Sequence, residues 1–255
     1  MIDAWHIGLL FGTGLAAGFV DSIAGGGGLI TLPVLLSTGI DPHSALGTNK
    51  LQAVFGSGGA TFHHLRAGSL KWAECRRGFF VTFVGALFGA GAVQCFDPNL
   101  LKRFIPVMLL AVALYVFFKP KFGEHDSAPR MTPGKFDLIF CLGIGFYDGF
   151  FGPGTGTFFT MAFALGLGFN LIKATAHTKA MNFASNIAAL ILFLCLNQVL
   201  FVAGLTMGVG QWLGARLGSR MVLRGGARFI RPVLIVVVVA ITLKLLRDAY
   251  FLPPK

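Results

Sequence analysis

Four ionisable residues stand inside long apolar stretches of the sequence, and they form two matching sets. Lys50 and Lys179 occupy equivalent positions, and Asp21 and Asp148 each precede a glycine cluster. An ionised side chain at membrane depth is costly unless it is paired or reached by water. Two interpretations follow. Either each lysine forms a salt bridge that locks its own half of the chain, or the lysines bind a substrate anion while the aspartates orient them or carry a coupling proton.

The glycine clusters predict breaks in two otherwise helical segments. The first cluster contains Gly25, Gly26, Gly27 and Gly28, and the second contains Gly152, Pro153, Gly154 and Thr155. Glycine in a helix interior costs about 0.8–1 kcal/mol relative to alanine, so four in succession should unwind the segment. Unwound backbone at membrane depth needs protein or water around it, and breaks at matching places of two halves point to a transporter's substrate site. The alternative is that these glycines only let helices pack closely.

A short apolar stretch follows each break. Residues 29–39 and 157–169 are too few to cross a bilayer comfortably, which indicates half-helices or re-entrant segments. A helix that starts at the break directs its N-terminal amides and the positive end of its dipole toward it. This arrangement favours a bound anion.

Neutral hydrogen-bonding side chains lie beside both lysines, as an oxyanion site requires. They are Thr48, Asn49 and Gln52 in the first half and His177, Thr178, Asn182, Ser185 and Asn186 in the second. Asn49 with Gln52, and Thr178 with Asn182, are three or four residues apart and therefore share a helix face. Polar contacts between helices are the alternative role for each residue. His177 has a further alternative as a pH sensor or proton relay.

These residues belong to two copies of one unit. Residues 18–28 are echoed by 145–155, residues 45–50 by 174–179, and the pair Gly85 and Gly89 by Gly210 and Gly214, at separations of 125 to 129 residues. Such internal repetition is typical of transporters built from two halves. We therefore expect a first repeat at 1–118, a polar linker at 119–134 and a second repeat at 135–255. The paired glycines fit packing within the chain, and a homodimer is the alternative.

Composition places the chain in a membrane. Hydrophobic residues make up 55% and charged residues 12% of the sequence, and the mean hydropathy is +0.76, whereas soluble domains are about 25% charged. The net charge of +11 is spread in short clusters between apolar runs, so we expect anionic lipid headgroups as a partner and no nucleic acid. No Gly-Lys-Ser/Thr follows Gly28, and the four cysteines form no metal or disulfide pattern, so no cofactor or metal is expected.

Eight apolar runs approach the length of a spanning helix, and the basic residues between them indicate the topology. The runs are 4–23, 43–63, 78–95, 103–118, 136–151, 172–196, 198–215 and 230–247. If the two short stretches also reverse the chain, 14 Lys and Arg residues fall on one side and 5 on the other, against 11 and 8 if they do not. The positive-inside rule favours the first arrangement. It makes the halves an inverted repeat with both termini on the periplasmic side.

The chain resembles the TauE/SafE sulfite exporter family over essentially its whole length. The resemblance is carried by residues 18–33, 48–53, 145–156 and 174–179, with 210–216 in the tail. Within that family the chain is most similar to the YfcA-type membrane proteins. The resemblance implies a secondary transporter of bacterial inner membranes for small anions, often sulfur oxyanions or organosulfur acids such as sulfite and sulfonates. It also implies that both glycine breaks and the Lys50 and Lys179 segments are shared family features.

We therefore expect an all-α integral membrane protein of two homologous halves, with eight full spans and two short segments around an anion site. Transport would proceed by alternating access, with export as the favoured direction. One alternative is an anion-selective channel with the two lysines at its constriction; another is a transporter of a non-sulfur organic anion. An intramembrane enzyme that uses His177, Asp148 and Cys141 is disfavoured, because no nucleophile motif connects these residues.

Overall fold

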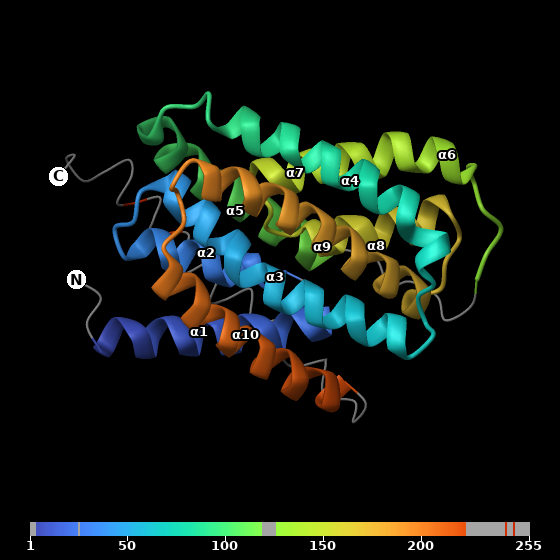
Figure 1. The fold of residues 1–255 in the computed structure, drawn as a ribbon, viewed down its shortest axis with the longest axis horizontal. Coiled ribbons are helices and arrows are strands. Elements are labelled where there is room, and N and C mark those ends of the chain that lie inside the picture. The colour runs from blue at the N-terminus through green and yellow to red at the C-terminus, as the bar shows by residue number, and fades with distance from the viewer. Residues whose placement is uncertain (1–3, 25, 119–125, 223–242, 244–246, 248–255) are drawn as a thin grey trace.

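The protein is a bundle of helices running in both directions along one long axis (Figure 1). The computed structural model describes residues 4–24, 26–118, 126–222, 243 and 247. The predicted first repeat contains α1 (Ala4–Ala24), α2 (Gly28–Ser37), α3 (Pro42–Arg66), α4 (Trp72–Val93) and α5 (Pro98–Phe118). The second contains the continuous α6 (Pro133–Phe136), η1 (Asp137–Cys141) and α7 (Leu142–Phe150), then α8 (Thr155–Gly166), α9 (Leu171–Cys195) and α10 (Phe201–Val222). Every element of this described part is helical, as predicted.

Three described helices are long and apolar enough to cross a membrane, judged by length and composition. They are Trp72–Val93, the Pro98–Tyr115 part of α5, and Leu171–Cys195. The other predicted runs that begin at residues 4, 43, 136 and 198 also coincide with helices. The run 230–247 lies almost entirely outside the described residues. The total of eight crossings therefore stays a prediction.

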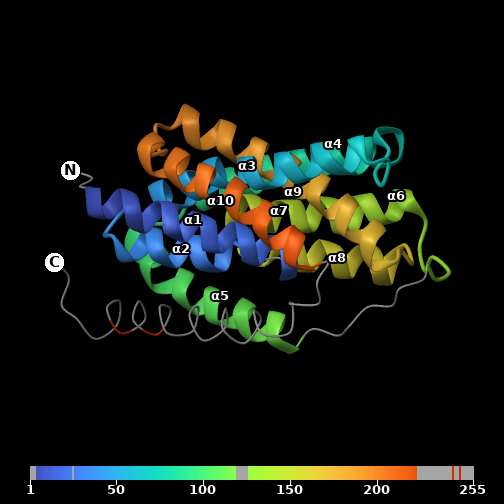
Figure 2. The ribbon, with the colours of Figure 1, turned by 90° about the horizontal axis from the view of Figure 1, so that it is seen from below.

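The chain breaks at both glycine clusters, and a short helix follows each break. Gly26, Gly152 and Gly154 have φ angles of 107°, 100° and 84°, a left-handed region that glycine enters without a steric penalty. Gly25 lies outside the described residues. Helices α2 and α8 are separate helices of 10 and 12 residues, and they lie toward opposite ends of the bundle (Figures 1 and 2).

Each short helix returns the chain to the end from which the preceding helix came. Helix α1 starts at the end of the bundle where α2 finishes, and α6 starts at the opposite end, where α8 finishes (Figure 1). The loops 38–41, 94–97 and 196–200 lie at the first end, and 67–71, 127–132 and 167–170 lie at the second (Figure 1). The short helices are therefore re-entrant, and each one begins in the interior of the bundle.

The outer helix pairs each join one helix from each half, and glycines allow them to touch. An added Cβ on Gly85 or Gly89 of α4 would overlap the Leu142 or Phe146 carbonyl oxygen of α7, and one on Gly214 of α10 would overlap the Leu15 oxygen of α1. Small residues let backbones approach in this way. The expectation that Gly85, Gly89, Gly210 and Gly214 pack within the chain is confirmed.

Helices α3 and α9 form the centre of the bundle, between the α1–α10 and α4–α7 pairs (Figure 1). Both begin at a capping side chain: Asp41 Oδ2 accepts from Ser44 N at 2.9 Å, and Asn170 Oδ1 accepts from Lys173 N at 2.9 Å. Such caps satisfy backbone donors that have no partner inside the helix. The two helices run antiparallel, because Gly47 packs against Phe193 whereas Gly58 packs against Phe183. Helix α5 lies to one side, against α2 and α3 (Figure 2).

Candidate functional site

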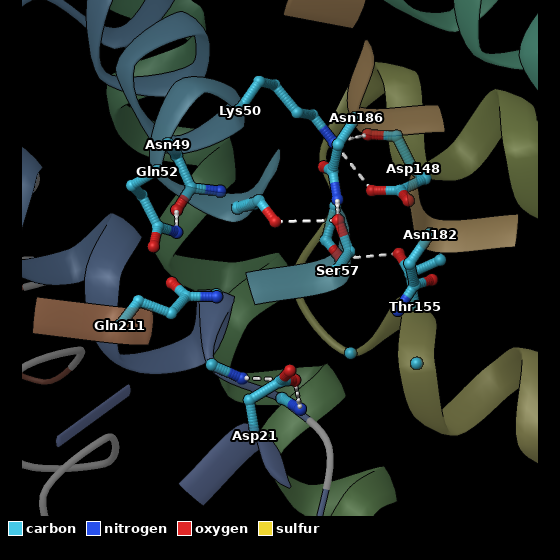
Figure 3. A pocket seen from close by; sticks show the side chains of 17 residues that line it. Asp21, Asn49, Lys50, Gln52, Ser57, Asp148, Thr155, Asn182, Asn186 and Gln211 are labelled. Carbon is cyan, nitrogen blue, oxygen red and sulfur yellow. Dashed lines mark hydrogen bonds and ion pairs between the residues drawn. The ribbon is translucent and has the colours of Figure 1, made fainter. Parts of the chain in front are cut away.

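A small cavity lies where the two glycine breaks meet. The breaks are adjacent, since an added Cβ on Gly28 would lie 3.3 Å from Pro153 Cα. The cavity has a volume of about 50 Å³ and is shown in Figure 3. Its lining residues are Asp21, Gly26, Gly27, Gly28, Asn49, Lys50, Gln52, Ala53, Ser57, Asp148, Gly152, Gly154, Thr155, Gly156, Asn182, Asn186 and Gln211. One water needs roughly 10–15 Å³ of such space, so this conformation has room for a few waters or one compact anion.

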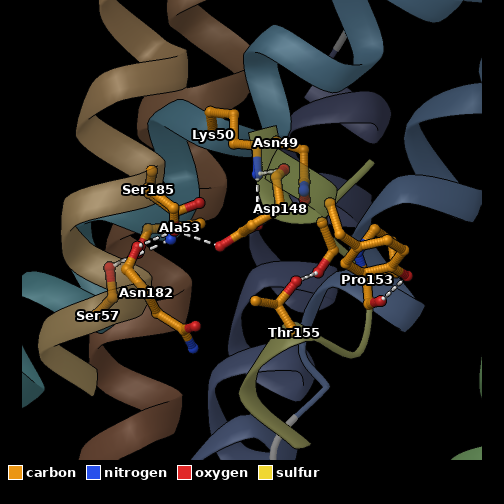
Figure 4. A network of polar contacts seen from close by, with 12 residues as sticks. Asn49, Lys50, Ala53, Ser57, Asp148, Pro153, Thr155, Asn182 and Ser185 are labelled. Atoms are coloured by element: carbon orange, nitrogen blue, oxygen red, sulfur yellow. Dashed lines mark hydrogen bonds and ion pairs between the residues drawn. The ribbon is translucent and has the colours of Figure 1, made fainter. Parts of the chain in front are cut away.

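Lys50 is the cation of this cavity, and its partner is Asp148. The Lys50 side chain is 1% exposed, and its Nζ lies 2.6 Å from Asp148 Oδ1. Lys50 Nζ also donates to the Asp148 carbonyl oxygen, and the Ser185 hydroxyl donates to Asp148 Oδ2 (Figure 4). Every charged oxygen of Asp148 therefore has a partner, which is what a buried carboxylate requires.

Lys179 forms the corresponding pair with Asp21. Its Nζ lies 2.8 Å from Asp21 Oδ2, in a less buried setting in which the two side chains are 10% and 21% exposed. The other oxygen, Asp21 Oδ1, accepts from the amides of Gly26 and Gly27 at 3.1 and 3.3 Å. The anion at the first break is thus the chain's own carboxylate. Lys179 itself is not among the residues that line the cavity.

Both ion pairs connect the two halves. Lys50 of α3 pairs with Asp148 of α7, and Lys179 of α9 pairs with Asp21 of α1. The interpretation in which each pair locks its own half is therefore wrong. The physical reason is that α3 and α9 pack against each other at the centre of the bundle, so that each lysine reaches the broken helix of the other half.

Amide side chains make up much of the remaining wall. Asn49 Oδ1 accepts from Gln52 Nε2 at 2.9 Å and from Thr31 Oγ1 at 2.5 Å. The side-chain oxygens of Gln52, Asn182 and Gln211 are buried without a hydrogen-bond partner. Because an amide can present either its oxygen or its N–H groups after a half-turn, these three side chains offer unused hydrogen bonds to a ligand in the cavity.

Besides Lys179 and Ser185, three other residues of the predicted set do not line the cavity. Thr48 Oγ1 accepts from Leu200 N at 3.0 Å, and Thr178 shares a 3.2 Å hydrogen bond with Thr160. His177 contacts the Lys173 carbonyl oxygen through Nδ1 at 2.9 Å and lines a second, more apolar cavity of about 300 Å³ with Phe163, Phe169 and Met181. These residues satisfy their polar groups in contacts between or within helices.

Gly156 lines the cavity as the last residue of the predicted second glycine break, and three lining residues were not in the predicted set: Ala53, Ser57 and Gln211. Ala53 and Ser57 follow Lys50 by three and seven residues, so the helical repeat on the Lys50 face would have found them. Asn186, four residues after Asn182, continues the predicted polar stripe into the cavity. Gln211 has no such signal, because the packing of α10 against α1 and α3 brings it to the site.

Comparisons with known proteins identify relatives along nearly the whole chain. A family model described as sulfite exporter TauE/SafE matches residues 10–245. The chain is 46% identical over 246 residues to the "Probable membrane transporter protein ORF9" of Sinorhizobium sp, which covers 96% of this chain and 94% of that protein. It is 44% identical over 250 residues to the "Probable membrane transporter protein YfcA" of Escherichia coli (strain K12), with 98% and 93% covered. It is also 43% identical over 242 residues to a "Probable membrane transporter protein" of Haemophilus influenzae, with 95% of each covered. No solved structure matches the chain.

Proposed function

Because the chain belongs to the sulfite exporter TauE/SafE family of membrane transporters, we propose that it is a secondary transporter of small anions in the bacterial inner membrane. Sulfur oxyanions and organosulfur acids, such as sulfite and sulfonates, are the proposed substrates, and export is the proposed direction. The observation that carries the proposal is the cavity between the two glycine breaks, with Lys50 in its wall. Lysine inside a membrane marks a substrate or ion path by default.

The proposed binding set is smaller than the set predicted from sequence. It contains Lys50, Asn49, Gln52, Asn182 and Gln211, with the backbone of both breaks and Thr155. Thr48, His177 and Thr178 have contacts outside the cavity, so we assign them to the surrounding scaffold. Lys179 is proposed to hold Asp21 and the first break in place.

We propose alternating access between two inverted halves. The antiparallel contact of the equivalent helices α3 and α9 supports this arrangement, as does the exchange of outer helices in the α1–α10 and α4–α7 pairs. In such folds the halves rock around a fixed midplane site. Broken helices that start at the cavity are the natural place for this movement, because their ends are not held by continuous helical hydrogen bonds.

The proposed orientation places the more basic end of the bundle in the cytoplasm. Among the described residues, Arg66, Lys71, Arg76, Arg77, Arg130, Lys135, Lys173 and Arg216 lie toward the end that holds the loops 67–71 and 127–132, and Lys102 and Arg103 lie toward the other. The positive-inside rule then places the loops 38–41, 94–97 and 196–200 on the periplasmic side, together with the start of α1. Both chain ends lie outside the described residues, so their periplasmic location stays a prediction from the sequence.

The test is a flux assay in proteoliposomes with labelled sulfite and a panel of monoanionic sulfonates. The wild type should show saturable flux that is stimulated by unlabelled substrate on the opposite side, which a channel does not show.

Asn182→Ala should raise the half-saturating concentration about tenfold, the effect of one lost hydrogen bond to a charged ligand. The matched control is Lys71→Ala, whose side chain is 74% exposed at the surface. Equal effects of the two substitutions would refute the site, and no saturable flux of any sulfur anion would refute the substrate class.

A further inference from the structure

We propose that the transported anion replaces Asp148 as the ion-pair partner of Lys50, and that Asp148 then takes up a proton. Each anion therefore moves together with one proton. This inference rests on the proposed function and concerns the same cavity. It follows from three features of the described residues: the charge of the cavity wall, the partners of Asp148 and the partners of Asp21.

Among the described residues that line the cavity, no positive charge is left unpaired. Its charged lining residues are Lys50, Asp148 and Asp21. Lys50 is neutralised by Asp148, and Asp21 is neutralised by Lys179 from outside the lining. A monoanion that enters therefore meets a site of zero net formal charge and adds one uncompensated negative charge to it. An unpaired ion in a protein interior is strongly unfavourable even after the surroundings relax.

One proton removes this cost. Before binding, the site holds the Lys50 ammonium and the Asp148 carboxylate; afterwards it holds the Lys50 ammonium paired with the substrate anion, and a neutral Asp148 carboxylic acid. One anion and one proton enter together, no covalent bond of the substrate changes, and the net charge of the site stays at zero. When the substrate leaves on the other side, Asp148 releases its proton and returns to Lys50.

Asp148 is suited to this exchange because its second partner works in both protonation states. The Ser185 hydroxyl now donates to Asp148 Oδ2. A hydroxyl both donates and accepts, so the same Ser185 oxygen can accept from a protonated carboxyl. Around Asp148, α3 contributes Lys50 and α9 contributes Ser185. Helix α4 faces this part of α7 with residues that do not titrate, such as Ala86, and the neighbouring Tyr147 hydroxyl donates to the Pro153 carbonyl oxygen at 2.7 Å.

Asp21 lacks this freedom. Its Oδ1 is fixed by the backbone amides of Gly26 and Gly27, which only donate, and its Oδ2 is fixed by Lys179. These donors stabilise the ionised form. Since Lys179 does not line the cavity, the substrate does not compete for it, and Asp21 keeps its partner throughout the cycle.

Coupling of this kind makes transport electroneutral. The membrane potential acts only on net charge that crosses the membrane, and an anion that moves with a proton carries no net charge. The direction of net flux is then set by the gradients of the anion and of pH, and the potential alone drives no export.

The experiment measures proton and anion fluxes together in proteoliposomes. A pH dye in the lumen reports protons while a labelled monoanionic sulfonate, such as isethionate or whichever panel member shows saturable flux, reports the anion. Sulfonates are used because they stay ionised and do not cross lipid as a neutral acid. The wild type should move one proton per anion, and a potential imposed with potassium and valinomycin should not change the flux.

The diagnostic variant is Asp148→Asn, whose amide imitates the neutral acid. It should still exchange labelled for unlabelled anion, a mode that moves no net protons, whereas under a one-way anion gradient its proton flux should fall from one per anion to none. The matched control, Asp21→Asn, should keep one proton per transported anion at whatever rate it works. A wild type that moves anions without protons and responds to the potential overturns the inference while the transporter function stands, and this result does not depend on either variant folding. A proton flux that persists in Asp148→Asn also overturns it. Absence of any saturable sulfur-anion flux removes the proposed function itself.

Discussion

At the scale of single residues, the two lysines do different work although the sequence presents them as equivalents. Lys50 lines the cavity and lies in a buried ion pair, whereas Lys179, which is not a lining residue, pairs with Asp21. The aspartate of the Lys50 pair is also the more buried one, since the Asp148 side chain is 4% exposed and the Asp21 side chain is 21% exposed. Burial decides how much an ion loses when its partner is removed, so the two pairs should respond differently to substitution.

Lys50→Met should destabilise the protein more than Lys179→Met. Loss of Lys50 leaves a buried carboxylate without its cation, which costs about 3–5 kcal/mol. Loss of Lys179 leaves an aspartate that water reaches in part and that keeps two backbone amides. Thermal unfolding of the purified protein in detergent measures the difference. The double variant Lys50→Met with Asp148→Leu should recover most of the stability but no transport; a double variant as unstable as Lys50→Met would contradict this account.

At the scale of elements, the glycines of the outer helices allow close packing between the halves. The glycines at the breaks instead allow the left-handed backbone angles found there. Gly89 lies against the Phe146 carbonyl oxygen of α7, while Gly91, two residues later on the same helix, faces open space. The α4–α7 and α1–α10 pairs both use such contacts. These pairs hold the first helix of each half in place, and with it Asp148 or Asp21.

Gly89→Ala should lower stability by about 1–3 kcal/mol, because its Cβ forces α4 away from α7. Gly91→Ala is the matched control on the same helix, and it should be neutral or slightly stabilising, since alanine favours a helix more than glycine does. Thermal unfolding and the fraction of monodisperse protein after purification check both. Equal behaviour of the two variants would show that α4 and α7 do not depend on this contact.

At the scale of the whole molecule, the two ends of the bundle should face different compartments. Cys95 and Cys195 are exposed free thiols near one end, where Gln94 and Gln198 share a 3.0 Å hydrogen bond. Ala128 is exposed in the loop at the other end. This arrangement allows the orientation to be measured without fusing a large reporter to the chain.

A membrane-impermeant maleimide should label Cys95 in intact spheroplasts, in a variant that keeps this cysteine alone. Ala128→Cys in a background without other cysteines should be labelled only after permeabilisation, because its loop belongs to the more basic end. Cys75 and Cys141 are buried, so a variant with only these two controls for unfolded protein. Labelling of Ala128→Cys in intact spheroplasts would reverse the proposed orientation.

The features that depend on local composition could be predicted from the sequence alone. The helical class, the breaks at both glycine clusters and the short helices after them follow from residue types within one segment, because glycine runs unwind helices and apolar runs form them wherever they stand. The polar stripe that leads from Lys50 could be extended to Ala53 and Ser57 by helical spacing alone.

The ion-pair partners across the halves could be identified only from the tertiary structure. Lys50 and Asp148 are 98 residues apart in the chain, and Lys179 and Asp21 are 158 apart; in both repeats the nearer aspartate is the wrong partner. Gln211 enters the cavity and Lys179 stays outside its lining for the same reason. The position of these side chains depends on how α1, α7 and α10 dock against the central helices, and such long-range packing leaves no periodic signal in the sequence.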